Sequence, residues 1–421
     1  MTSFRFLHCA DLHLDSPLRG LEADPDAPAD TIRAATRKAL TNLVDHALNE
    51  RVDFVVAAGD LYDGDWQDWR TGHFLIGEIK RLDQAGISFI AIRGNHDADN
   101  VMTKNLRFPG TRSRLLNHRQ PETIRLDTVP VSIHGQSFAT RAVTENIARA
   151  YPRPDPDRFN IGLLHSAIDG RDGHDHYAPC SLDQLRDHGY EYWALGHVHK
   201  REILSREPWV VFPGNVQGRH ANETGAKGAM LVTVTGNRVT DAAFVPLDVM
   251  RWARVPVEPD AAAGEEAVLS AVRDALSGEL ARADGRLLAV RIALSGVTAA
   301  HDILTRDPGA MREKIRAEAL AVAGAGMIWI ETVEVATRPP ARAAAAEQSG
   351  AIGQLIRALD AIGPDDLREG MRVYAASMLD RAPMLRQALD ADHAAARLGE
   401  DETPAELIQR ARDLLLGFLV E

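Results

Sequence analysis

The sequence predicts an α/β protein in which two β-sheets pack face to face with helices outside them. A small α+β domain and a helical C-terminal region follow. Three observations lead to this fold class. The N-terminal part alternates short apolar runs with helical stretches, in the order strand, helix, strand, helix, strand. After Gly110 short strands dominate. A length of 421 residues exceeds one ordinary domain and indicates two or three.

The N-terminal alternation predicts a parallel sheet covered by helices. Apolar, β-branched runs at 4–10, 53–58 and 87–93 are typical of buried strands. The stretches 31–49 and 70–83 carry apolar residues at helical spacing, such as Ile32, Ala35 and Ala39. Functional residues in such folds gather beyond the carboxyl ends of the strands, so a site is expected there.

The rest of the first domain predicts mostly strands, which would complete the two-sheet sandwich. Strands are expected at 122–126, 129–134, 159–165, 190–196, 201–205, 209–212, 228–235 and 239–246. Helices are expected only at 141–150 and 181–187.

The pattern changes again near residue 248, so we expect a first domain at 1–248. Residues 249–337 predict a small α+β capping domain, with strands at 252–258, 286–295 and 327–337 and helices at 265–280 and 301–323. The segment 338–348 is rich in Pro and Ala and predicts a linker. Residues 349–421 show helical spacing, as in Ile352, Leu355 and Ile356, which suits docking onto the helices of a partner.

The composition is that of a globular protein, with 45% hydrophobic and 26% charged residues. No run approaches the roughly 20 apolar residues of a membrane span, and the N-terminus shows no secretory signal. Two cysteines give no disulfide framework. These features favour a cytoplasmic protein without membrane association. The net charge of −12 means that a polyanionic substrate would have to be attracted locally, by metals or a basic patch.

Polar clusters follow five of the predicted strands. They are Asp11-Leu12-His13, Gly59-Asp60-Leu61-Tyr62-Asp63, Gly94-Asn95-His96-Asp97, His165 and Gly196-His197-Val198-His199. Each cluster alone is typical of a turn or a satisfied polar pair. All five together, each at a strand end, indicate one shared site. Carboxylate, imidazole and amide ligands suit Mn²⁺, Fe²⁺ or Zn²⁺, and the near absence of cysteine argues against a thiolate-rich structural zinc site.

This set of clusters resembles the calcineurin-like metallophosphoesterase superfamily. The longer arrangement, with a small second domain and a helical tail, resembles the DNA repair exonucleases of the SbcD type. Within that group, Gly59-Asp60-Leu61-Tyr62-Asp63-Gly64 and the segment Pro213 to His220 are similar to the YhaO branch. The chain departs from the best-known SbcD relatives after Asp63, where a proline-rich turn is replaced by a segment containing Trp66 and Trp69.

The resemblance implies a site for two divalent metal ions, with Mn²⁺ foremost and Mg²⁺, Fe²⁺ or Zn²⁺ as alternatives. The first metal would be held by Asp11, His13 and His199. Asp60 would bridge both ions. The second metal would be held by Asn95, His165 and His197. A shared water, activated by the metals, would attack the phosphodiester in line with its leaving oxygen.

The resemblance also implies roles for the neighbours of these ligands. His96 would act catalytically, by stabilising the transition state or protonating the leaving oxygen. Asp63 and Asp97 would orient imidazoles from behind, with loop capping as the alternative for both. Arg219 and His220 would touch substrate phosphate, unless they only form a turn.

The choice of substrate depends on less specific features. Lys104 and Arg107 begin a basic stretch that reaches Arg125 and could steer a DNA backbone, although a solvated surface run has the same appearance. The resemblance implies DNA as the substrate and an SbcC-like, SMC-type ATPase as the partner. A homodimer is a further possibility that the sequence does not decide. The alternatives are a phosphodiesterase for small molecules or cyclic nucleotides, and a non-catalytic scaffold that recruits the ATPase.

Overall fold

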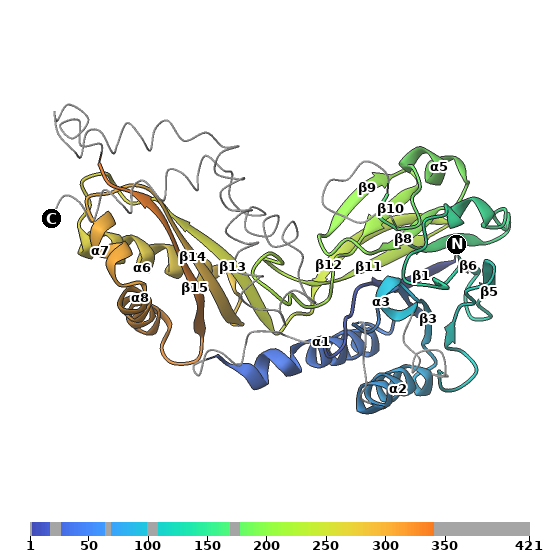
Figure 1. Ribbon diagram of the computed structural model, residues 1–421. Coiled ribbons are helices and arrows are strands. Elements are labelled where there is room, and N and C mark those ends of the chain that lie inside the picture. Colours follow the sequence, from blue (N-terminus) through green and yellow to red (C-terminus); the bar gives the residue numbers. More distant parts are fainter. Residues whose placement is uncertain (1, 17–26, 64–68, 99–107, 169–176, 341–421) are drawn as a thin grey trace, which may run out of the picture. The chain divides into compact units, whose positions relative to one another are not determined.

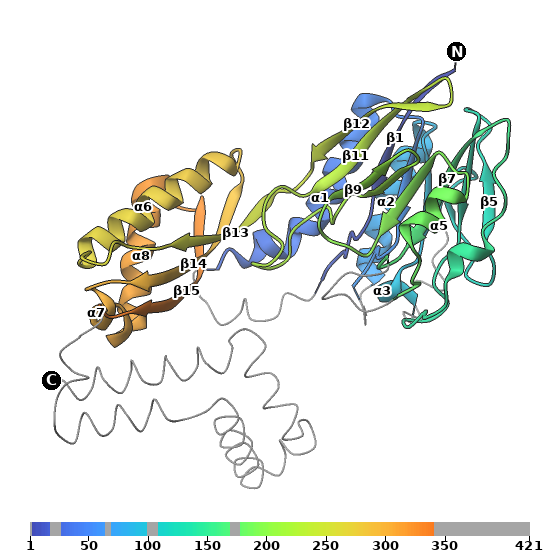
Figure 2. The same cartoon turned by 90° about the horizontal axis from the view of Figure 1, so that it is seen from above.

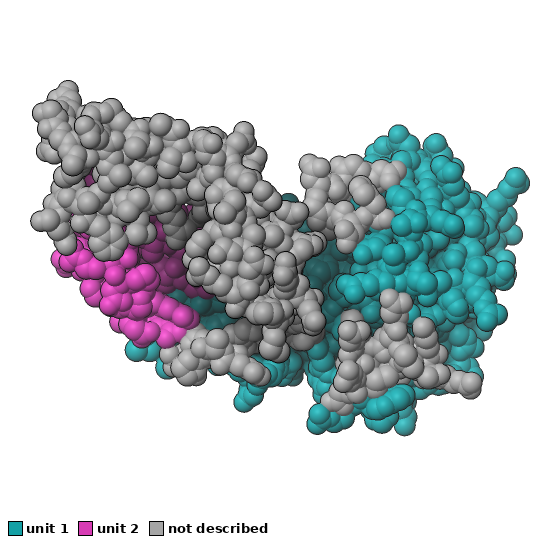
Figure 3. All heavy atoms as spheres, viewed as in Figure 1, with its two compact units in different colours: residues 1–254, 277–291, 319–331 teal, residues 255–276, 292–318, 332–421 magenta. Residues whose placement is uncertain are grey.

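The computed structural model describes residues 2–16, 27–63, 69–98, 108–168 and 177–340 (Figure 1). Two compact units can be distinguished. One comprises residues 1–254, 277–291 and 319–331, and the other comprises 255–276, 292–318 and 332–421 (Figure 3). In the described part of the chain, no helix is both long enough and apolar enough to cross a membrane.

The first unit contains a six-stranded sheet in the order β12-β11-β1-β2-β3-β4. Its strands are β1 (Ser3–Cys9), β2 (Phe54–Ala58), β3 (Ser88–Ile92), β4 (Arg114–Leu115), β11 (Gly228–Thr235) and β12 (Arg238–Pro246). β1 to β4 run parallel, as the N-terminal alternation predicted, and β11 joins β1 antiparallel. The helices α1 (Ala29–Glu50) and α2 (Trp69–Gln84) lie along its outer face (Figure 1). Leu43, Ile79 and Phe89 belong to the core between them and the sheet.

A second six-stranded sheet has the order β5-β6-β7-β8-β10-β9. Its strands are β5 (Glu122–Arg125), β6 (Val131–Gly135), β7 (Phe159–His165), β8 (Tyr192–Gly196), β9 (Glu202–Arg206) and β10 (Trp209–Phe212). Phe6, Ile90 and Ile161 are fully buried in one core shared by both sheets, so the two sheets face each other. The outer face of the second sheet is covered by α5 (Leu182–Asp187) and by the 3₁₀ helix η2 (Ile147–Ala150). The predicted two-sheet sandwich is confirmed.

The expected helix at 141–150 is wrong over most of its length, because only Ile147–Ala150 are helical. The carbonyl of Val143 accepts the N–H of Ala178 at 2.7 Å, so this segment satisfies its backbone through a loop contact instead of a helix. The predicted strands at 159–165, 209–212 and 228–235 are observed with those bounds.

A third sheet, in the order β13-β14-β15, follows the sandwich in sequence. It consists of β13 (Met250–Val257), β14 (Leu287–Val297) and β15 (Ile328–Arg338), and the helices α6 (Glu265–Arg282), α7 (His301–Arg306) and α8 (Pro308–Ala323) lie along one of its faces (Figures 1 and 2). Pro308 separates α7 from α8, because proline disfavours helix at the preceding residue and fits the first helical turn. Asp307 Oδ1 accepts the N–H of Ala310 at 2.9 Å. The predicted linker beyond residue 340 and the helical region 349–421 lie outside the described residues.

Candidate metal centre

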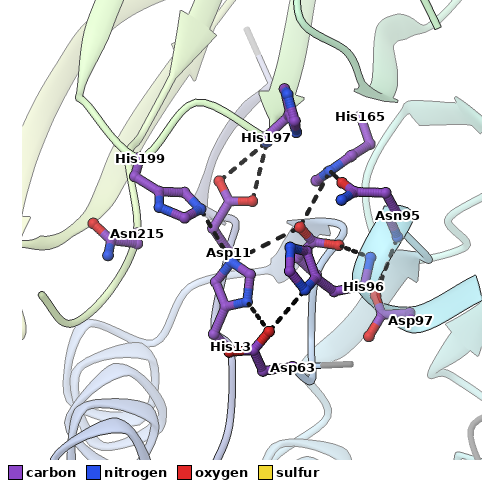
Figure 4. Close-up of polar contacts among 12 residues, drawn as sticks. Asp11, His13, Asp63, Asn95, His96, Asp97, His165, His197, His199 and Asn215 are labelled. Atoms are coloured by element: carbon purple, nitrogen blue, oxygen red, sulfur yellow. Dashed lines mark hydrogen bonds and ion pairs between the residues drawn. The ribbon is translucent and has the colours of Figure 1, made fainter. Parts of the chain in front are cut away.

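The polar residues of the first sheet stand at the ends of adjacent parallel strands. Asp11 follows β1, Asp60 follows β2, and Asn95 opens the single helical turn α3 (Asn95–Ala98) after β3. The second sheet contributes His165, the last residue of β7, and His197 just after β8. Because the strands of each sheet end at one edge and the sheets face each other, these side chains meet in one place (Figure 4).

The turns that carry these residues hold an unusual backbone conformation. Asp11 (φ 52°), His13 (φ 41°), Asp60 (φ 51°) and His197 (φ 98°) all have positive φ. Residues with a Cβ rarely adopt this region, and such strain is concentrated at functional sites. The Asp11 N–H donates to Gly59 O and the His13 N–H to Asp60 O, both at 3.0 Å, so the two turns support each other.

Glycine is required where the strand ends approach most closely. A Cβ on Gly94 would lie 2.3 Å from Asp60 Oδ1 and 2.7 Å from His165 Nε2. A Cβ on Gly196 would lie 1.9 Å from Ala58 O. These two glycines therefore allow the carboxylate and imidazole groups to come together.

Among the described residues, three groups of side chains have ligand atoms within 4.8 Å of one another and could hold a metal ion. The groups are Asp11, His13 and His199; His13, Asp60 and His96; and Asp11, Asp60 and His165. Asp60 and His13 each belong to two groups, as does Asp11. Asn95 joins the third group, since its Oδ1 lies 2.9 Å from His165 Nε2.

His197 takes part through its backbone. Its N–H donates to both carboxylate oxygens of Asp11, at 3.0 and 3.1 Å. Its ring lies against those of His165 and Tyr177, with centroids 5.2 and 5.4 Å apart, and belongs to none of the three groups found among the described residues. The structure thus brings the other predicted ligands together by their side chains.

The Nε2 atoms of His13 and His199 approach each other in an arrangement that suits a bound cation. The two atoms lie 3.0 Å apart. The opposite nitrogens approach carboxylates: His199 Nδ1 lies 2.6 Å from Glu223 Oε1, and His13 Nδ1 lies 3.7 Å from Asp63 Oδ1. Burial lowers the pKa of His13 to about 3, so this ring is neutral. The two Nε2 atoms therefore approach one point from two sides, where both could ligate the same metal ion.

The surroundings of His165 also favour a positive charge. Its Nδ1 lies 2.8 Å from Ala58 O and must donate there, so Nε2 faces Asn95 Oδ1 and, at 3.4 Å, Asp60 Oδ2. Burial alone would lower the pKa of His165, but the charge of Asp60 raises it to about 9. Burial acts to raise the pKa of Asp60, and His165 nevertheless brings it well below its usual range. A proton or a metal ion fits between these groups.

The carboxylate of Asp63 holds the imidazole of His96. Its Oδ1 lies 2.7 Å from His96 Nδ1, and its Oδ2 accepts from the Ser16 hydroxyl. Burial acts to lower the pKa of His96, and the hydrogen bond to Asp63 raises it above its ordinary value. His96 is therefore more readily protonated than a free histidine. This contact is of the kind that the resemblance implied for Asp63.

Asp97 accepts hydrogen bonds from the backbone of both turns. Its carboxylate accepts the backbone N–H groups of Leu61, Tyr62 and Gly94 at 3.0, 2.9 and 3.1 Å. Burial, with the charge of Asp60, raises the pKa of Asp97 to about 7. These contacts tie the turn after β2 to the turn after β3, which corresponds to loop capping.

The remaining predicted residues divide into three cases. Arg219 reaches the centre, but its guanidinium contacts Asp63 at 3.0 Å and Glu223 at 3.2 Å. His220 is more than half exposed and lies 3.4 Å from Glu223. Lys104 and Arg107 lie outside the described residues. The sequence interpretation missed Glu223 altogether, and the only available signal was an acidic residue four positions after Arg219.

Comparison with known proteins agrees with this geometry. Residues 4–201 match the family model for calcineurin-like phosphoesterases, and residues 252–338 match the model for the middle domain of metallophosphoesterase YhaO. The chain is 36% identical over 329 residues to the metallophosphoesterase YhaO of Bacillus subtilis (strain 168), covering 75% of this chain and 78% of that protein.

More distant relatives carry the names of a DNA repair protein and of a nuclease subunit. The DNA double-strand break repair protein Mre11 of Methanopyrus kandleri is 28% identical over 222 residues, which cover 48% of this chain and 45% of that protein. A component of the nuclease SbcCD from Staphylococcus epidermidis is 24% identical over 277 residues, covering 59% of this chain and 70% of that protein. The extent of the match to YhaO is decisive, and the chain belongs to the YhaO family of calcineurin-like metallophosphoesterases.

Proposed function

We propose that this metallophosphoesterase hydrolyses the phosphodiester bonds of DNA with two divalent metal ions, Mn²⁺ first among them. The observation that carries the proposal is the position of Asp60. Its Oδ2 lies 3.8 Å from His13 Nε2 and 3.4 Å from His165 Nε2, so one carboxylate stands between two sets of imidazoles. A carboxylate in that position suits bridging of two cations.

The residues present fit two ions. Asp11, His13 and His199 would hold one of them, Asn95 and His165 the other, and Asp60 both. His197 would join the second set through its ring. Bound ions supply Lewis acidity toward the phosphate and activate a water as nucleophile. Of the described residues, those of the centre offer nitrogen and oxygen donors without thiolate, which suits Mn²⁺ and similar ions.

His96 would transfer the proton that the leaving oxygen needs. Its Nδ1 is held by Asp63, so Nε2 is the atom offered to substrate. The side chain is 28% exposed, whereas those of His13 and His165 are fully buried, so a substrate can reach His96 but not these two imidazoles. A protonated imidazole at this place can donate to the departing alkoxide.

DNA is proposed as the substrate because relatives of this chain are named as a DNA repair protein and as part of a nuclease. The family resemblance adds a cytoplasmic SbcC-like, SMC-type ATPase as partner, with residues 349–421 as its docking region. Lys104 and Arg107, which follow Asn95 closely in the sequence, would contact the DNA backbone. His220 would do so if its exposed ring reaches a phosphate.

The proposal is tested with the purified full-length chain, linear double-stranded DNA, single-stranded DNA, a cyclic nucleotide and bis(p-nitrophenyl) phosphate, each with Mn²⁺. We expect DNA cleavage that EDTA abolishes and that His96→Ala reduces. Hydrolysis of the small diesters, with no DNA cleavage even beside the ATPase, would assign the site to small substrates instead.

A further inference from the structure

The segment between β10 and β11 places a buried carboxylate behind the metal centre. The side chain of Glu223 is only 5% exposed. Its Oε1 accepts from His199 Nδ1 at 2.6 Å, and its Oε2 accepts from the Arg219 backbone N–H at 2.7 Å and from Asn215 Nδ2 at 2.8 Å. A carboxylate held by this many hydrogen-bond donors has one fixed orientation. Because it contacts the imidazole of His199, it also fixes the orientation of that ring.

Arg219 joins this carboxylate to the one that holds His96. Its Nη2 lies 3.2 Å from Glu223 Oε1, and its Nη1 lies 3.0 Å from Asp63 Oδ2. The guanidinium is largely buried, at 13% exposure. A planar fork with separate nitrogens for two carboxylates fixes both more firmly than a lysine could. The guanidinium also offsets part of their negative charge.

We propose that Glu223 and Arg219 are positioning residues of this centre. Glu223 fixes the ring orientation and hydrogen-bonded form of His199, so that its Nε2 is presented to the metal beside His13. Arg219 links this support to Asp63 and through it to His96, and is committed to protein carboxylates more than to substrate phosphate. The inference rests on the proposed function, since it concerns how the same centre holds its metal.

Three features distinguish this support from ordinary loop packing. The shortest contact of Glu223 is with the ring nitrogen of a predicted metal ligand. The Nε2 atom on the opposite side of that ring faces the site, 3.0 Å from His13 Nε2. The same carboxylate contacts Nη2 of Arg219, and Nη1 of that guanidinium contacts Asp63, the partner of His96. Loss of such a support typically lowers metal affinity by 10–100-fold.

The test is calorimetric titration of the full-length chain with MnCl₂ alone. Glu223→Gln keeps the size of the side chain and removes its charge. We expect it to weaken one class of Mn²⁺ site by about 10–100-fold and to leave the other within a few-fold. Arg219→Lys should weaken Mn²⁺ binding at the same class of site by a smaller factor than Glu223→Gln does. Arg219→Ala should weaken it by a larger factor than Arg219→Lys does.

A matched control is available in Glu78, a buried carboxylate that pairs with Arg81 at 2.6 Å on the same helix, α2. Glu78→Gln should leave both Mn²⁺ affinities unchanged. Thermal unfolding without metal shows whether each variant folds. Even if the more disruptive variant Glu223→Ala does not fold, the Mn²⁺ affinity of Glu223→Gln still tests whether Glu223 positions His199.

A second readout separates positioning from general loosening of the structure. In a His199→Asn background, Glu223→Gln should change Mn²⁺ affinity by less than about two-fold, because the group through which it acts is gone. Equal effects in both backgrounds would overturn the inference, as would a folded Glu223→Gln chain with wild-type Mn²⁺ affinities. Failure of the wild-type chain to bind Mn²⁺ would instead contradict the proposed function, and the inference with it.

Discussion

Asp63 Oδ1 lies 2.7 Å from Nδ1 of His96, a partly buried imidazole of the candidate metal centre. The contact engages Nδ1 of the ring and raises the pKa of His96 against the effect of burial. A raised pKa favours the protonated imidazole, which can release its proton to a leaving group. The pair therefore links the geometry of the centre to its chemistry.

The first prediction concerns this pair. His96→Ala should lower kcat for phosphodiester hydrolysis by roughly 10²–10⁴-fold, the usual contribution of a positioned acid. Asp63→Asn should lower it by a smaller factor, since the imidazole stays but loses its charged partner. Initial rates at saturating Mn²⁺ give kcat. Full activity of His96→Ala on a substrate with a poor leaving group would rule out the assigned proton transfer.

A second prediction uses the missing Cβ of Gly94. Gly94→Ala would place a methyl group 2.3 Å from Asp60 Oδ1, so the carboxylate must shift. We expect Mn²⁺ affinity, measured by calorimetry, to fall at least about ten-fold, as for other displaced ligands.

The control for Gly94→Ala is Gly77→Ala. Nothing lies within 4 Å of a Cβ at Gly77, which is inside α2. That change should stabilise the fold by about 0.5–1 kcal/mol and leave metal binding unaltered. Equal Mn²⁺ affinities for the two alanine variants would contradict the close approach at Gly94.

A third prediction concerns removal of the metal. An ion that binds only the folded chain adds about 2.7 kcal/mol per site when its free concentration is 100 times Kd. Mn²⁺ should therefore raise the unfolding free energy, and EDTA should reverse the gain. Asp11→Asn should remove the part of the gain that comes from the ion held by Asp11, whereas Asp30→Asn, at an exposed position at the start of α1, should leave the gain unchanged. Urea titrations with and without Mn²⁺ measure the difference.

A fourth prediction concerns acid stability and His8. This fully buried ring bonds Tyr192 Oη and Leu195 O, and burial lowers its pKa from 6.5 to about 3. Between those values the unfolded chain binds a proton at this imidazole and the folded chain does not. The stability from neutral His8 is therefore present above pH 6.5 and is lost as pH falls toward 3.

The test of this prediction compares the wild-type chain with His8→Gln in urea, with EDTA present, from pH 8 to pH 5. The wild-type advantage in unfolding free energy should shrink by up to about 1.4 kcal/mol per pH unit below 6.5. An advantage that stays constant over this range would show that His8 is not held neutral in the fold.

The sandwich and most of the metal centre follow from one pattern in the sequence. Asp11, Asp60 and Asn95 each come directly after a buried apolar run, and parallel strands bring such residues to one edge. His165 gave no signal of its own, yet its place at the end of β7 could be predicted from the strand alone. Local pattern was sufficient because the strand ends themselves are the site.

Long-range contacts could not be predicted in the same way. Glu223 lies in a loop with no periodicity, and only the folded chain shows that its carboxylate meets His199. The hydrogen bonds that Asp97 accepts from the backbone of Leu61 and Tyr62 also depend on how two turns meet in the folded chain. The expected helix at 141–150 was wrong for a related reason, since its loop pairs with Ala178, far along the chain.

The most direct test of the account is the number of Mn²⁺ ions bound per chain, measured calorimetrically for the wild-type protein and for Asp60→Asn. Asp60 stands between His13 and His165, so we expect two ions for the wild-type chain and a loss of affinity at both sites in the variant. A wild-type chain that binds a single ion, or an Asp60→Asn chain that keeps two with unchanged affinity, would contradict the two-metal centre.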